Sequence, residues 1–328
     1  MSYDYENIEF FNLTEAQTRQ FIDAESAWRA LEDARAEAAQ VRGSMLWRTQ
    51  SGRQYLVRVA SSGAQTSLGP HSPENTLIFE RFMARKAMAS ERLKQLKSTV
   101  QTQVRLNRAL RVGRVPNVVV DTLNALADAG LKDNFLTVGT HALFAYETAC
   151  GVRVQPEATA TKDNDLLLDT RRHLQFATTM KRLDTSLLGI FQKVDKTFVL
   201  RQDQKYTAVN ASGFEIDVIR RSANSSAGTD SHPLRVSDFE DDFWAVQISS
   251  GQALLDGGRF TQVVVGTSGQ MATMHTPSPS SFVCIKTAIA ERPDRDPLKS
   301  PKDKLQAQVV QKLLTDYGLQ QIIDARRL

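Results

Sequence analysis

Two short segments with paired acidic residues place the strongest constraint on the fold. Over residues 214–219, apolar side chains alternate with Glu215 and Asp217. This alternation predicts a β-strand with one apolar and one acidic face, because successive side chains point to opposite sides. Asp163 and Asp165 also stand two apart, just before an apolar run. Adjacent carboxylates repel each other, and a divalent cation relieves that repulsion. If the two strands are neighbours, the sequence therefore predicts a three-carboxylate metal site.

A Gly-Thr pair supplies a second element of the expected site. The apolar strand expected over residues 134–138 leads into Gly139 and Thr140, and a helix-like run follows. Glycine lets a phosphate approach the backbone, while a hydroxyl and the free amides of a helix start bind anions. A phosphate cradle opposite metal-binding carboxylates fits metal-assisted phosphoryl transfer.

Together these motifs resemble the DNA polymerase beta-like nucleotidyltransferase superfamily. Its pattern is an apolar residue with Gly and a small hydroxyl residue, then Asp-x-Asp or Asp-x-Glu, then a later Asp between apolar residues. The matching segments are Val138-Gly139-Thr140, Asp163-x-Asp165 and Ile216-Asp217-Val218. Within the superfamily the chain is similar to a bacterial group with Gly-Thr-x-Ala-Leu-x-Ala-Tyr-Glu before the Asp pair, as in residues 139–147. Thr140 stands where Ser is commoner.

The resemblance implies an enzyme that moves a nucleoside monophosphate from an NTP, such as ATP, to a hydroxyl and releases pyrophosphate. Asp163, Asp165 and Asp217 are the implied catalytic residues and the implied ligands of Mg²⁺ or Mn²⁺. Asp217 would also help to deprotonate the acceptor hydroxyl. The acceptor stays open between RNA such as tRNA, a protein side chain and a small molecule, because a superfamily does not fix its substrate.

Gly139, Thr140 and Lys286 are the implied nucleotide-binding residues. Lys286 stands in an otherwise apolar helical stretch. Two roles stay open for Lys286: its ammonium group contacts the triphosphate, or it only extends to the solvent-exposed surface. Lys302 and Asp303 begin the last long helix, where a solvated first turn is the expected role.

Two alternative assignments concern the acidic residues. The Asp pair at 163 and 165 could open a calcium loop, but such a loop needs Gly at its sixth and Glu at its twelfth position. The chain has Leu168 and Leu174 there, which excludes that loop. Glu215 shares the strand face of Asp217 and could be the ligand instead. We favour Asp217 because apolar residues flank it immediately, as the family pattern requires.

The charge of the chain is distributed unevenly. The net charge is only +4, yet residues 81–114 hold a single acidic residue, Glu91, and ten basic ones. The basic residues are Arg81, Arg85, Lys86, Arg92, Lys94, Lys97, Arg105, Arg108, Arg111 and Arg114. Such a run is either a solvated helix face or a footprint for nucleic acid or nucleotide phosphates. The rival hypothesis is therefore a nucleic-acid-binding protein with a degenerate nucleotidyltransferase core, which the three intact carboxylates argue against.

The 328 residues allow two or three compact units. We expect helices, a β-hairpin and the basic arm over residues 1–115, a nucleotidyltransferase core over 116–230, and a C-terminal helical region with a short hairpin over 231–328. Antiparallel-dominated strands with helices on one face favour an α+β fold, built on a mixed nucleotidyltransferase-type sheet, over a doubly wound one.

The remaining features favour a cytoplasmic protein with no membrane partner. No apolar run reaches membrane-spanning length, and the opening residues lack the basic-then-apolar order of a signal peptide. Cys150 and Cys284 show no metal-ligand spacing, and both fit buried, reduced thiols.

Overall fold

The computed structural model describes residues 8–222 and 234–325. The polar run over residues 222–233, whose Ser, Gly and Pro content predicts a surface loop, lies almost wholly outside the described residues. The chain forms two compact units. The large unit comprises Met1–Thr18 and Arg111–Leu328, and the small unit comprises Arg19–Leu110. The three-part division drawn from the sequence stays a prediction.

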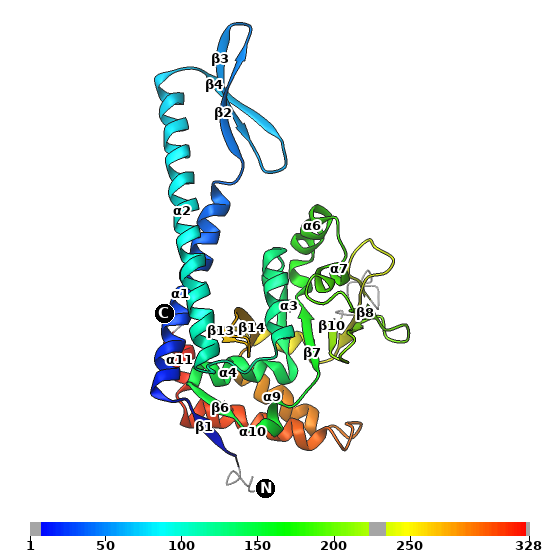
Figure 1. Ribbon diagram of the computed structural model, residues 1–328. Helices are drawn as coiled ribbons and strands as arrows, with labels where there is room; N and C mark the ends of the chain where they lie inside the picture. Colours follow the sequence, from blue (N-terminus) through cyan, green and yellow to red (C-terminus); the bar gives the residue numbers. More distant parts are fainter. Residues whose placement is uncertain (1–7, 223–233, 326–328) are drawn as a thin grey trace. The chain divides into compact units, whose positions relative to one another are not determined.

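The small unit combines two helices with a three-stranded antiparallel sheet (Figure 1). Its elements are most of α1 (Glu15–Gln40), then β2 (Ser44–Gln50), β3 (Arg53–Val59), β4 (Gln65–Pro70) and α2 (Pro73–Ala109). The hairpin β2–β3 confirms the expected one. The Ser-, Gly- and Pro-rich run over residues 61–73, a composition that predicts a loop, contains the third strand. Helix α2 starts where Ser72 accepts a hydrogen bond from the backbone N–H of Asn75, with Pro73 in its first turn.

Polar side chains fix the register of α1 against α2. The amide of Gln20 is buried and donates to Oε1 of Gln103 at 2.8 Å and to Oδ1 of Asn107 at 3.0 Å. Farther along, Arg92 and Glu37 form an ion pair at 2.7 Å. Because buried polar groups are costly without partners, this network favours one alignment of the helices.

A seven-stranded mixed sheet forms the centre of the large unit and confirms the predicted α+β class (Figure 1). Its strands are β5 (Phe135–Val138), β7 (Asp163–Leu168), β8 (Val199–Leu200), β9 (Thr207–Val209), β10 (Glu215–Arg221), β11 (Leu234–Arg235) and β12 (Trp244–Ile248). β10 runs parallel to β7 and β12, and β5 runs antiparallel to β7. β9 pairs with the first half of β10 in the antiparallel sense.

Helices and two strand pairs complete the large unit. The helices are α3 (Asn117–Asp128), α4 (Ala142–Cys150), α5 (Pro156–Thr159), α6 (His173–Leu183), α7 (Leu187–Gln192), α8 (Gly251–Asp256), α9 (Pro279–Ala290), α10 (Ser300–Asp316) and α11 (Leu319–Ala325). The strand pairs are β1 (Phe10–Asn12) with β6 (Val152–Val154), and β13 (Arg259–Val265) with β14 (Met271–Pro277). The core joins Tyr146 of α4 to Phe260 and Phe282, with ring centroids 5.7 and 5.5 Å apart.

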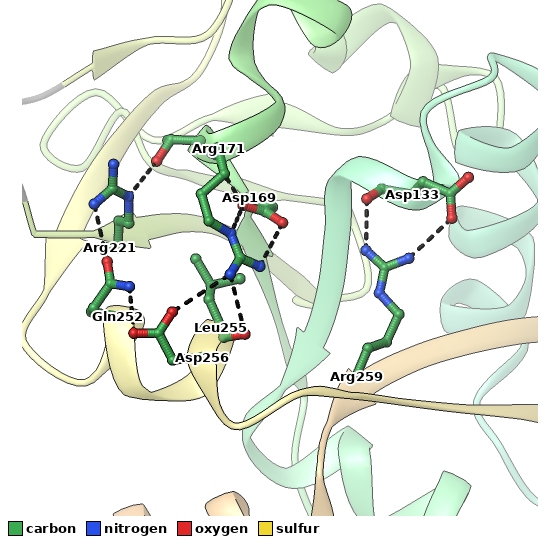
Figure 2. Close-up of polar contacts among 9 residues, drawn as sticks. Asp133, Asp169, Arg171, Arg221, Gln252, Leu255, Asp256 and Arg259 are labelled. Carbon is green, nitrogen blue, oxygen red and sulfur yellow. Dashed lines mark hydrogen bonds and ion pairs between the residues drawn. The ribbon is translucent and has the colours of Figure 1, made fainter. Parts of the chain in front are cut away.

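A polar network joins α8 to the ends of β7 and β10, and Figure 2 shows its members. Arg171 donates to Asp169 at 2.8 Å and lies 3.5 Å from Asp256. Arg221 donates to the amide oxygen of Gln252 at 3.0 Å, and the Gln252 amide donates to Asp256 at 2.6 Å. The network holds α8 in place, and Ser249 and Ser250, which directly precede this helix, line the cavity described below.

Asp184 adopts a left-handed conformation that ends α6 before α7 begins. One expectation requires correction. Cys284 is exposed rather than buried, whereas Cys150 is half-buried. Cys284 lies about 200° around α9 from the buried Phe282, so the apolar stretch presents it to solvent. Over the residues that the structure describes, no helix has the combined length and apolarity to cross a membrane.

Candidate functional site

The acidic strands lie side by side, as the sequence analysis required. In the parallel pairing of β7 with β10, Asp217 stands opposite Asp165, and Glu215 stands opposite Asp163. A cavity of about 1170 Å³ opens over these strands. Its lining includes all six residues predicted for the site, namely Gly139, Thr140, Asp163, Asp165, Asp217 and Lys286. Their roles stay predictions, but the fold brings them to one cavity.

The three aspartates form an electrostatically unfavourable group. Burial, together with the negative charges of Asp163 and Asp217, raises the pKa of Asp165 to about 7. Burial also raises the pKa of Asp217, while a hydrogen bond from the Thr207 hydroxyl at 2.6 Å opposes that rise. None of the three carboxylates forms an ion pair with a described residue. A group of this kind favours a bound cation.

Glu215 has a different environment from its neighbour two residues on. Its carboxylate pairs with Arg201 at 3.0 Å, and Arg201 also contacts Asp203 at 3.2 Å. The negative charge of Glu215 is therefore already offset by a side chain. This difference supports the choice of Asp217 over Glu215 as the ligand.

The close approach of the Asp165 carboxylate requires a glycine at position 139. Its φ of 64° lies in the left-handed region, and a Cβ atom there would collide with Oδ2 of Asp165. The glycine thus leaves room for the carboxylate as well as for a phosphate. Asp165 is held against the turn that begins α4, where the short 3₁₀ segment Gly139–His141 precedes the helix.

We expect Gly139→Ala to weaken divalent-cation binding by the three aspartates, in addition to a modest loss of stability. Gly151→Ala is a matched control, because Gly151 has a φ of 67° and open space around its Cα. Both variants should lose about 1 kcal/mol of unfolding free energy from the unfavourable φ. Only Gly139→Ala should also weaken divalent-cation binding in calorimetry. Equal cation affinities in the two variants would contradict the close approach of Asp165.

A buried ion-pair cluster also lines the cavity and corrects one expectation. Asp303 is only 3% exposed, so it is not part of a solvated first turn. Its Oδ1 accepts from Lys286 at 2.7 Å, and its Oδ2 accepts from Arg295 at 2.7 Å. The first turn of α10 packs against α9, which explains the burial. Asp303 thereby fixes two cations that line the cavity.

Sequence reasoning also missed Gln306. Its amide donates to the Thr140 hydroxyl at 2.9 Å and to the backbone oxygen of Ala158 at 2.8 Å. It ties α10 to the Gly-Thr turn. Lys302, one turn earlier, donates to the backbone oxygen of Ala160 at 2.7 Å and also lines the cavity. A polar residue one turn after Asp303 was the sole sequence signal, and only burial distinguishes it from a surface glutamine.

Two residues near the motifs have structural roles. His141 is 1% exposed and packs against Phe144 and Phe214, and burial lowers its pKa to about 4. It does not line the cavity, so its position gives no support for a contact with a bound phosphate. Arg114 of the basic run pairs with the buried Glu147 at 2.5 Å, so this arginine stabilises the core.

The donor set fits a hard divalent cation. Carboxylate oxygens are the ligands that Mg²⁺ and Mn²⁺ prefer, and three of them lie on adjacent strands with no side-chain cation paired to them. Within the described part of the chain, no three His, Cys, Asp or Glu side chains are already gathered as a metal cage. Thr161 and Thr207 donate to Oδ1 of Asp163 and Oδ1 of Asp217, so the second oxygen of each carboxylate accepts no hydrogen bond from these hydroxyls.

Comparison with known proteins places this geometry in a family. No curated protein and no solved structure matches the chain. A family model described as "Nucleotidyltransferase" matches residues 117–327, a range that contains the Gly-Thr turn, both acidic strands and the cluster around Asp303. The match covers well over half of the chain, and the chain belongs to the Nucleotidyltransferase family.

Proposed function

We propose that the protein is a metal-dependent transferase that moves a nucleoside monophosphate from an NTP to an acceptor hydroxyl and releases pyrophosphate. The observation that carries this proposal is one cavity lined both by the three carboxylates and by a group of cations. The carboxylates suit a divalent cation, and the cations suit a triphosphate. Family membership supports nucleotidyl transfer in general, and the cavity supports the metal and the NTP.

The group of cations is the proposed triphosphate site. Lys286 and Arg295 are fixed by Asp303, while Lys299 and Lys302 line the same cavity. Fixed cations bind phosphate oxygens with little loss of side-chain entropy. The hydroxyl of Thr140, oriented by its partner on α10, is the proposed neutral contact to the phosphates.

The group of three carboxylates is the proposed reaction centre. When bound by Asp163, Asp165 and Asp217, Mg²⁺ or Mn²⁺ supplies positive charge to the phosphoryl oxygens. Asp217 accepts the proton of the acceptor hydroxyl, as its place at the cavity allows. The Thr207 hydroxyl, 2.6 Å from Oδ1 of Asp217, orients this carboxylate.

The test is cation-dependent NTP binding. We expect calorimetry with Mn²⁺ and a non-hydrolysable NTP to show binding that Asp163→Ala combined with Asp165→Ala abolishes. The double variant loses two of the three carboxylates that are candidate ligands, and we do not expect the remaining aspartate to retain a divalent cation by itself. Glu157→Ala with Glu240→Ala, two acidic residues outside the cavity lining, removes the same charge and should bind as the parent does.

Undiminished NTP affinity in the double aspartate variant, with and without Mn²⁺, would refute the metal site. Loss of binding in both double variants would show a general charge effect. Binding of nucleic acid without any cation-dependent NTP binding in the parent would instead favour a degenerate core.

A further inference from the structure

The small unit carries a long segment with no carboxylate. From residue 38 to residue 73 the chain has no Asp or Glu but four arginines, Arg42, Arg48, Arg53 and Arg58. This segment forms the sheet β2–β4. Arg48 and Arg53 are exposed, whereas Arg58 lies over the Phe82 ring at 4.2 Å and donates to the backbone oxygen of Arg42. The sheet therefore presents positive charge with no acidic side chain of its own to offset it.

Helix α2 also carries an excess of positive charge. Residues 41–110 hold twelve Lys and Arg against three Glu. Lys86 is bound to the backbone oxygen of Gly43, and Arg92 is paired with Glu37. The remaining basic residues of α2 are exposed, with no carboxylate partner among the described residues. They are Arg81, Arg85, Lys94, Lys97, Arg105 and Arg108.

Four of these cations form a stripe. At 100° per residue, Lys94, Lys97, Arg105 and Arg108 lie within about 80° of one another around the helix axis. With 1.5 Å of rise per residue, the stripe is about 21 Å long. A polyanion with evenly repeated charges can contact such a stripe along its length, whereas a single phosphate group contacts only one end. The acidic residues of the small unit lie mainly on α1, on the other helix.

We propose that this basic surface, made of the sheet β2–β4 and the exposed cations of α2, binds the phosphate backbone of a polynucleotide, and that this polynucleotide is the acceptor. The second part rests on the proposed function. A polynucleotide has two features that match the protein. Its repeated phosphates complement the basic surface of the small unit, and its ribose or deoxyribose hydroxyl is an acceptor for nucleotidyl transfer. An acidic polypeptide or an anionic lipid surface also offers repeated negative charges, but neither of them combines these charges with a ribose or deoxyribose hydroxyl.

The test is direct binding by the full chain, without turnover. Bulk tRNA labelled with a fluorophore is titrated with the parent and with the stripe variant, in which Lys94, Lys97, Arg105 and Arg108 are all changed to Glu. The matched control reverses four exposed cations of the large unit, Lys181, Arg182, Lys193 and Lys196. Both variants change the net charge equally, so only the place of the charge differs. Circular dichroism and thermal melting check that each variant is folded.

We expect the stripe variant to bind tRNA roughly tenfold more weakly or worse, and the control to bind nearly as the parent does. The log–log salt slope should also fall by up to about 3, since each single-strand phosphate contact contributes about 0.7. Equal losses in the two variants, or affinity without salt dependence, would overturn the proposal. So would equal or tighter binding of the parent to poly-glutamate or to vesicles containing phosphatidylserine. A single-stranded DNA of matched length distinguishes the two kinds of polynucleotide.

Failure of this inference is distinguishable from failure of the proposed function. The stripe variant should keep the cation-dependent NTP binding of the parent, and the double aspartate variant should keep its tRNA binding. Loss of tRNA affinity in the double aspartate variant alone would place the nucleic-acid site at the carboxylates and overturn the inference.

Discussion

Replacing Asp217 with Asn is expected to lower nucleotidyl transfer by roughly 10²- to 10⁴-fold, the contribution of a positioned general base. Asn keeps the shape and the hydrogen bond from Thr207, but it has neither the charge nor the basicity of the carboxylate. NTP binding should fall much less, because Asp163 and Asp165 remain. Single-turnover kinetics at saturating NTP measures this difference.

Glu215→Gln is the matched control for that variant. Glu215 stands on the same strand face and lines the same cavity, but Arg201 already pairs with it. We expect its transfer rate to stay within about tenfold of the parent rate, because the charge lost is one that a side chain already offset. If Glu215→Gln is the severe variant and Asp217→Asn is active, the two roles have been assigned to the wrong residues.

Asp303→Asn is expected to lower the unfolding free energy of the protein by about 3 kcal/mol, at the lower end of the cost of breaking a buried ion pair. The side chain of Asp303 is 4% exposed and touches two cations, so its loss leaves Lys286 and Arg295 close together without a counter-charge. Chemical denaturation followed by circular dichroism measures the change. A double-mutant cycle with Lys286→Met should give a coupling energy of about 1 kcal/mol or more.

Asp294→Asn provides the comparison for Asp303→Asn. Asp294 pairs with Arg292 at the same distance of 2.7 Å, but the two side chains are 68% and 48% exposed. Solvent screens an exposed pair, so this variant should be almost as stable as the parent. Equal losses in the two aspartate variants would show that burial does not determine the role of Asp303.

The sequence by itself determined the parts of the site that depend on local pattern. Alternation with a period of two placed Asp217 on a strand face, and the spacing of Asp163 and Asp165 placed both on one face of another strand. The Gly-Thr turn followed from an apolar strand that ends in glycine. These features are local because strand pleating and turn geometry are set by neighbouring residues. These motifs carry the resemblance to the family, and the antiparallel-dominated strands with helices on one face predict the α+β class.

Only the tertiary structure decided which residues share the cavity with those motifs. In the sequence, Asp303 and Gln306 are indistinguishable from solvent-exposed residues of a helix. Their burial depends on the packing of α10 against residues far away in the sequence. The same holds for Arg114, which belongs to the basic run but pairs with Glu147 in the core. Sequence can count charges, but burial and partners come from contacts between distant segments. Those contacts decide which charges remain available to bind a phosphate.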